Sequence, residues 1–199
     1  MSADAALLKA ALSGSAGACK VALANGASVG CQDEDGDTAL AIAAYEGHLE
    51  CVALLLAAGS SLEKANKAGK SPLFQAAYSG QPAVVSELLR AGAAVEGAGA
   101  DRTPLLVAAQ YGRVAVIKLL LEAGANAEAR SADGRSAWKL AANKAATCAD
   151  VRALLPKPSR KKRARPGRAG AIAKPALPGR AVALVIAALL AALGLFLRR

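Results

Sequence analysis

Residues 103–124 read TPLLVAAQYGRVAVIKLLLEAG, and related copies of this stretch run through the first 155 residues of the chain. The copies begin with TALAIAA at 38, SPLFQAA at 71 and SAWKLAA at 136, so that the four starts are 33, 32 and 33 residues apart. A weaker copy, ALLKAA at 6–11, extends the series to five. A period of this length predicts stacked supersecondary units that bury their apolar faces against one another.

Each copy predicts two short helices. Thr103-Pro104 supplies an N-cap hydroxyl and a proline that preforms the first helical turn, and Ser71-Pro72 does the same. The second helix carries an apolar stripe at i, i+3 and i+4, as in Val52, Leu55 and Leu56. A glycine suited to the left-handed conformation ends each second helix. These glycines are Gly59, Gly92 and Gly124, and a mid-repeat glycine also occurs at Gly47, Gly80 and Gly112.

The period and the T-P-L-x-x-A pattern resemble those of ankyrin-repeat proteins, whose unit of about 33 residues carries T-P-L-H-x-A. The resemblance covers roughly residues 4–155 and implies an all-α solenoid of about five repeats in residues 1–155. The histidine of the motif is replaced in the four clear copies, by Ala41, Phe74, Leu106 and Lys139. The first and last copies, residues 4–30 and 136–155, are degenerate, as expected of repeats whose outer face meets water.

Composition separates a neutral body from a basic tail. The formal net charge is +10, but residues 1–155 carry 14 basic and 15 acidic side chains, whereas residues 156–199 carry 11 basic and none acidic. The body is therefore not a basic nucleic-acid-binding domain, and we expect no nucleic acid, no cofactor and a monomer. The whole chain has 53 alanines and only six aromatic residues, a composition that suits closely stacked helices. The cysteines show no C-x-x-C pair, and the N-terminal residues show no basic-then-apolar secretory pattern, so we expect reduced thiols in a cytosol-facing protein.

The resemblance implies a non-catalytic protein that binds a protein partner on a concave face made of turn tips and first helices. The tip residues that correspond by position are Asp33, Glu34, Asp35, Asp37, Asn66, Lys67, Lys70, Asp101, Arg102, Asp133 and Arg135. The exposed pairs on the first helices would be Tyr45-Glu46, Tyr78-Ser79 and Gln110-Tyr111. Tyrosine beside charged residues is typical of binding hot spots. The alternative is that the tyrosines only cover neighbouring alanines.

Other chemistry has weak support in the body. His48 and Cys51 are spaced to share one helix face, but no third ligand or orienting carboxylate accompanies them. The run Asp33–Asp37 has the alternating acids of a calcium loop without its later ligands, so a solvated turn is the better interpretation.

The tail predicts a membrane anchor. Residues 156–180 hold five prolines and nine basic residues and predict an unfolded linker. Residues 181–197, AVALVIAALLAALGLFL, are apolar without a charge, and as a helix they span about 25 Å, slightly less than the hydrocarbon core. This arrangement resembles tail-anchored proteins, whose functional domain faces the cytosol. The basic residues expected at the membrane surface are Arg160, Lys161, Lys162, Arg163, Arg165 and Arg168.

The sequence thus predicts a membrane-tethered adaptor or scaffold on the cytosolic face of an intracellular membrane. The endoplasmic reticulum and the mitochondrial or plastid outer membrane remain open as locations. The alternative is a soluble nuclear or cytosolic regulator, in which Lys162-Arg163-Ala164-Arg165 is an import signal and the apolar terminus is buried in a partner.

Overall fold

In the computed structural model, the described residues are 2–97, 102–141 and 148–157, and they fold into pairs of short helices joined by tight turns. All of these described residues belong to one compact unit. The first helices of the repeats are α1 (Ala3–Ser13), α3 (Ala39–Glu46), α5 (Pro72–Ser79), α7 (Pro104–Tyr111) and α9 (Ala137–Leu140). The second helices are α2 (Ala16–Ala24), α4 (Leu49–Ala57), α6 (Pro82–Arg90), α8 (Val114–Glu122) and α10 (Cys148–Leu154).

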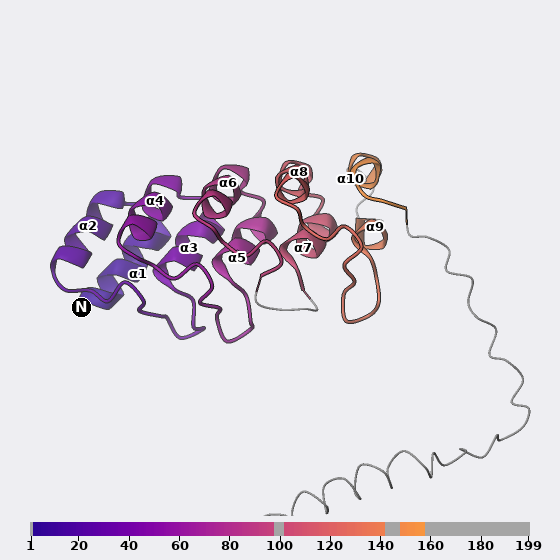
Figure 1. Ribbon diagram of the computed structural model, residues 1–199. Coiled ribbons are helices and arrows are strands. Elements are labelled where there is room, and N and C mark those ends of the chain that lie inside the picture. Colours follow the sequence, from indigo (N-terminus) through magenta and orange to yellow (C-terminus); the bar gives the residue numbers. More distant parts are fainter. Residues whose placement is uncertain (1, 98–101, 142–147, 158–199) are drawn as a thin grey trace, which may run out of the picture. The chain divides into compact units, whose positions relative to one another are not determined.

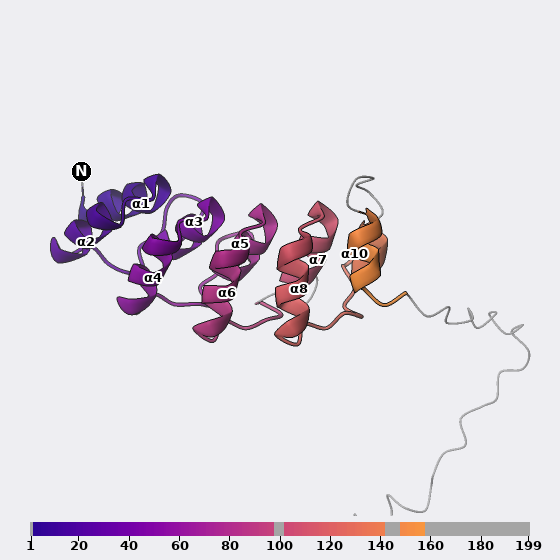
Figure 2. The same ribbon diagram turned by 90° about the horizontal axis from the view of Figure 1, so that it is seen from above.

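The helices stack in two rows. Each first helix packs against the first helix of the next repeat, from α1 to α9, and each second helix packs against the next second helix, from α2 to α10. Figures 1 and 2 show these rows and the turns that project beyond the first-helix row. We call the surface formed by the first helices and these turn tips the inner face. The predicted all-α solenoid of five helix pairs is confirmed.

Hydroxyl side chains start the first helices, at Ser71 and Thr103 as the sequence predicts and also at Thr38. Thr38 Oγ1 accepts a hydrogen bond from the Ala41 N–H at 3.1 Å, and Ser71 and Thr103 cap α5 and α7 in the same way. All three caps are buried, so each removes a backbone donor that would otherwise lack a partner away from water. Ser136 holds the same position before α9 but makes no side-chain cap.

Small residues at the helix contacts produce the tight stacking. Ala43, Ala44, Ala76 and Ala77 are fully buried between neighbouring first helices. Larger apolar side chains fill the space between the two rows. The fully buried ones include Leu40, Leu73, Leu105, Val52, Leu55, Val85, Leu88, Ile117 and Leu120. Each such leucine contributes about 2 kcal/mol through removal of apolar surface from water, which offsets the scarcity of aromatic residues.

Side chains from the following repeat bind the C-terminal ends of the first helices. Gln81 Nε2 donates to the Glu46 carbonyl oxygen at 3.4 Å, and Arg113 Nε donates to the Tyr78 carbonyl oxygen at 3.3 Å. Both side chains cross a glycine with positive φ: a Cβ on Gly47 would lie 2.5 Å from Gln81 Cδ, and one on Gly80 would lie 2.5 Å from Arg113 Cδ. We call these side chains straps.

The last repeat differs from the others. Helix α9 has only four residues, and Trp138 stands where the other first helices carry leucine. The Arg152 guanidinium of α10 lies over the Trp138 ring, with its Cζ 4.2 Å from the ring centroid. This cation–π contact joins the two helices of the pair that closes the stack.

The predicted linker and membrane segment fall outside the described residues, which end at 157. The boundary predicted at 155 comes just after α10. None of the helices in residues 2–97, 102–141 and 148–157 combines the length and hydropathy needed to cross a bilayer.

Candidate functional site

Three tyrosines, one from each of three successive first helices, form a row on the inner face. The ring centroids of Tyr45 and Tyr78 lie 6.0 Å apart in a stacked arrangement, and those of Tyr78 and Tyr111 lie 4.6 Å apart, edge to face. Both arrangements are favourable for aromatic pairs. We call this row the tyrosine ladder. The repeat spacing of the tyrosines therefore becomes direct contact in space.

The exposure of the predicted pairs is confirmed in part. Tyr45, Glu46 and Gln110 are exposed, whereas Tyr78, Ser79 and Tyr111 are half-buried. Tyr78 loses exposure because its ring lies between the other two, and Ser79 because its hydroxyl donates to the Gln75 carbonyl oxygen at 3.1 Å. Three of the six side chains thus offer less free surface than the sequence predicted.

The first turn tip is acidic and held by its own side chains. Asp33 Oδ1 accepts hydrogen bonds from the N–H groups of Asp35 at 3.0 Å and Asp37 at 2.8 Å. Asp37 Oδ1 in turn accepts from Asn66 Nδ2 at 2.9 Å and from Gln75 Nε2 at 3.1 Å. These oxygens are therefore engaged with the protein, which argues against the calcium-loop alternative for this run.

The second tip repeats this construction with the opposite charge. Asn66 Oδ1 accepts from the N–H groups of Ala68 and Lys70, both at 3.0 Å. Lys67 donates from Nζ to the Glu34 carbonyl oxygen, so the second tip is bound to the first. Lys70 is directed to the ladder, with its Nζ 5.8 Å from the centroid of the Tyr78 ring.

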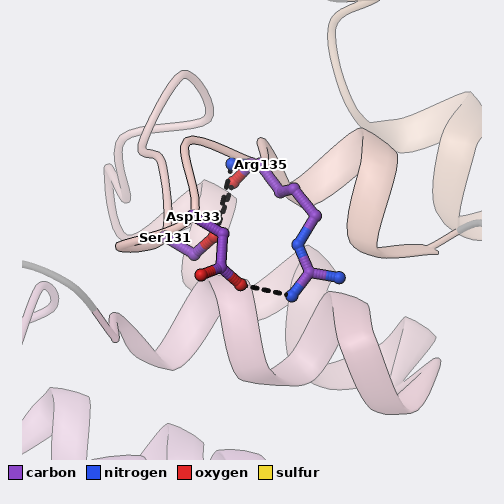
Figure 3. A network of polar contacts seen from close by, with 3 residues as sticks. All are labelled: Ser131, Asp133 and Arg135. Atoms are coloured by element: carbon purple, nitrogen blue, oxygen red, sulfur yellow. Dashed lines mark hydrogen bonds and ion pairs between the residues drawn. The ribbon is translucent and has the colours of Figure 1, made fainter.

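The last tip uses serine in place of the Asp33 and Asn66 side chains. Ser131 Oγ accepts from the Arg135 N–H at 3.3 Å, and Arg135 Nη2 forms an ion pair with Asp133 Oδ2 at 2.7 Å (Figure 3). Both charged side chains are largely exposed. Arg102, from the third tip, is also exposed, and Asp101 lies outside the described residues.

A cavity of about 450 Å³ opens on the inner face beside the ladder. Seven of the tip and helix residues predicted from the sequence line it: Lys70, Tyr78, Arg102, Gln110, Tyr111, Asp133 and Arg135. The other predicted residues that the structure describes lie outside its lining: Asp33, Glu34, Asp35, Asp37, Tyr45, Glu46, Asn66, Lys67 and Ser79. The predicted binding residues therefore include two groups, those of the acidic first tip and those that line the cavity. We call this cavity, with its cationic and aromatic lining, the cationic cavity.

Sequence reasoning missed the apolar side chains of the cavity. Phe74, Leu106 and Leu140 line it and are almost completely buried, with 5%, 3% and 3% of their surface exposed. Phe74 and Leu106 stand where the family motif has histidine, so the replacement was visible in the sequence. What it could not show is that both side chains reach the same cavity.

The ionisation of Tyr111 in the ladder depends on Tyr78 and on Arg102 at the cavity rim. A side-chain hydrogen bond with Tyr78, and next the burial of the phenol, raise the pKa of Tyr111 above its ordinary value. The positive charge of Arg102 acts in the opposite direction. Tyr111 is therefore a neutral, hydrogen-bonded phenol at physiological pH, placed beside a cation.

His48 and Cys51 do not act together in the fold. His48 Nε2 lies 3.2 Å from the Leu12 carbonyl oxygen, which makes this ring the strap between the first two repeats. Cys51 instead approaches Cys19 of α2, with the sulfurs 4.0 Å apart and both residues fully buried. Burial raises the pKa of the Cys19 thiol to about 11. In the described part of the chain, no three metal-binding side chains come together.

The residues predicted to lie at a membrane surface are not placed. Arg160, Lys161, Lys162, Arg163, Arg165 and Arg168 all lie outside the described residues. They remain a prediction from the sequence.

Comparison with known families agrees with the repeat geometry. A model of ankyrin repeats in three copies matches residues 7–98, and a model of the single ankyrin repeat matches residues 100–132. No curated protein matches the chain. The family models together cover more than half of the sequence and leave out residues 133–199, which include the divergent last repeat. With its capped first helices and stacked pairs, this chain belongs to the ankyrin-repeat family.

Proposed function

We propose that this chain is a non-catalytic adaptor that captures a protein partner on its inner face while its tail holds it on the cytosolic side of an intracellular membrane. The observation that carries the proposal is the meeting of Tyr78 and Tyr111 of the ladder with charged residues of the second, third and last tips around one cavity. Ankyrin repeats are interaction modules, which supports the binding half of the proposal.

The composition of the inner face supports protein binding. Tyrosine and arginine are the side chains most enriched among binding hot spots, because they combine large contact area with directed hydrogen bonds. Tyr78, Tyr111, Arg102 and Arg135 meet at the cavity. Three of the four already lie on a rigid helix or a hydrogen-bonded tip, so little conformational entropy is lost when a partner binds.

The membrane half rests on the sequence of the tail. A charge-free apolar run at 181–197 follows nine basic residues in 156–180, the order expected when the preceding domain stays on the cytosolic side. Each basic residue near an anionic surface adds about 1 kcal/mol of attraction. The endoplasmic reticulum and the outer membranes of mitochondria or plastids are the proposed locations.

Alkaline carbonate extraction tests the anchor. We expect the full chain to stay in the membrane pellet, and the variant Leu190→Arg to move to the supernatant, because an arginine within the apolar run costs about 3 kcal/mol. Ala173→Arg in the linker is the matched control and is expected to stay in the pellet. Release of the unchanged chain into the supernatant, with nuclear staining of intact cells, would favour the soluble regulator.

Site-specific photo-cross-linking tests the binding face. A benzophenone amino acid at the exposed position of Gln110 on the inner face is compared with one at exposed Lys118 on α8 of the other row. We expect discrete cross-linked products in cells from position 110 and not from position 118. Equal products from both positions would contradict capture by the inner face.

A further inference from the structure

The buried part of the cationic cavity is apolar. Phe74 from α5, Leu106 from α7 and Leu140 from α9 line it, so three successive first helices contribute to its floor. Its volume of about 450 Å³ falls in the range of sites that hold small ligands or single anchoring side chains. These side chains are at most 5% exposed, so an apolar group that enters the cavity packs on a floor that is already formed.

The rim of the same cavity is positively charged. It holds Lys70, Arg102 and Arg135 against a single carboxylate, Asp133. That carboxylate is already paired, because Arg135 Nη2 lies 2.7 Å from Asp133 Oδ2. Among the described residues, no ion pair joins Lys70 or Arg102 to a carboxylate. Two cations from neighbouring tips thus stand beside an apolar floor.

The charge of the inner face changes sign along the repeats. The first tip carries Asp33, Glu34, Asp35 and Asp37, none of which lines the cavity. A partner with acidic residues is therefore attracted to the cavity and repelled by the first tip. This difference gives one preferred position on a surface whose backbone otherwise repeats.

We propose that the cationic cavity binds an acidic peptide segment of the protein partner, with one apolar side chain on the Phe74–Leu106–Leu140 floor and flanking carboxylates at Lys70 and Arg102. This inference rests on the proposed function and names the chemistry of its partner. A peptide fits better than a nucleic acid, because phosphates alone would leave the floor uncovered and the neighbouring acidic tip would repel an extended polyanion.

A photoactivatable peptide provides the test with the full chain in detergent micelles. The probe has nine residues, with two glutamates on each side of a central benzoylphenylalanine and glycines at the ends. The matched probe carries glutamine in place of glutamate. We expect the glutamate probe to bind about tenfold more tightly than the glutamine probe, since several partly exposed charge pairs each add a modest gain.

The double variant K70E/R102E locates the binding. We expect it to weaken the glutamate probe about tenfold, because two attractive pairs become repulsive. The control K118E makes the same change of charge on α8 and is expected to alter the affinity less than twofold. All variants keep the basic tail, so attraction of the probe to residues 160–168 does not differ between them.

Mass spectrometry of the cross-linked chain reports the site directly. Attachment within α5 or α7 supports the proposal. Attachment confined to residues 156–180, unchanged binding by K70E/R102E, or equal displacement by a single-stranded oligonucleotide of the same charge would overturn it. If the peptide fails while position 110 still cross-links a protein in cells, the partner is not acidic and the proposed function stands. If both fail, the inner face is not the binding site.

Discussion

Neighbouring repeats are joined differently at the ends of their first and second helices, although glycine with positive φ occurs at both. At the first-helix ends, Gly47 and Gly80 have φ of 86° and are covered by the strap of the next repeat. At the second-helix ends, Gly59 and Gly92 have φ of 86° and 96°, and a Cβ would meet open space. Positive φ therefore favours glycine at both ends, but only at the first-helix ends does a packed side chain also leave no room for a Cβ.

The second-helix ends use carboxylates instead of straps. Glu63 Oε1 accepts from the Ala94 N–H at 2.7 Å, and Glu96 Oε1 accepts from the Asn126 N–H at 2.6 Å. Both bonds join the loop after one second helix to the loop after the next. They involve exposed backbone groups and leave room around the glycines. We infer that the first-helix ends tolerate substitution less than the second-helix ends do.

Gly80→Ala has the largest expected effect. The left-handed conformation costs alanine about 1 kcal/mol or more, and displacement of the Arg113 strap costs about 1 kcal/mol further through its lost hydrogen bond. We expect a loss of about 2–3 kcal/mol in the free energy of unfolding, measured by urea denaturation with circular dichroism. Gly59→Ala, with the same φ and open space, is expected to lose about 1 kcal/mol. Equal losses would contradict the comparison.

The alkaline pH dependence of stability tests the packing of the second helices. Burial favours the neutral Cys19 thiol, whose pKa rises from 9.0 to about 11, so its stabilisation is present below pH 9 and is lost as the pH rises through 11. The lost stabilisation is on the order of 2 kcal/mol. Cys19→Ala removes this titration and should make unfolding less dependent on pH between 9 and 11. An unchanged slope would show that the thiol does not resist ionisation.

The sequence predicted the elements within each repeat better than the contacts between repeats. The sequence placed the helix pairs, the Ser71 and Thr103 caps and the glycines, because each depends on local backbone chemistry. Contacts between repeats depend on the separation and rotation of neighbouring helices, which no single copy encodes. The role of His48 as a strap and the approach of Cys19 to Cys51 were missed for this reason.

The candidate site divides in the same way. Positional correspondence identified Tyr78, Arg102 and Arg135 as surface residues, and all three line the cavity. It could not show that Phe74 and Leu106 form one floor, since exposure of an apolar residue depends on how far the neighbouring tip reaches. The predicted surface therefore contains an acidic first tip and a cationic cavity that the later tips share with the first helices.

Glu96→Gln is a smaller perturbation of the second-helix joints. The amide oxygen still accepts from the Asn126 N–H, but the bond loses its ionic character, and we expect a loss of about 1 kcal/mol or less in unfolding free energy. Glu122→Gln, exposed on α8, is the control and should change stability by less than about 0.5 kcal/mol. A loss in unfolding free energy as large as that of Gly80→Ala would contradict the inference that the second-helix ends tolerate substitution better.

Replacement of Tyr45, Tyr78 and Tyr111 by alanine is expected to change stability little and to weaken partner binding strongly. Tyr45 is exposed, and Tyr78 and Tyr111 pack at the edge of the core as well as on their neighbours in the ladder. The two rows are held by fully buried leucines and by the straps. The Arg113 strap binds the backbone carbonyl of Tyr78 and is therefore kept in the variant. We expect unchanged helicity, a melting temperature lowered by a few degrees at most, and loss of the cross-linked products formed from position 110. Retained cross-linking would mean that the tyrosines only cover the alanines beneath them, and a collapse of helicity would mean that the ladder is a joint between repeats rather than a binding surface.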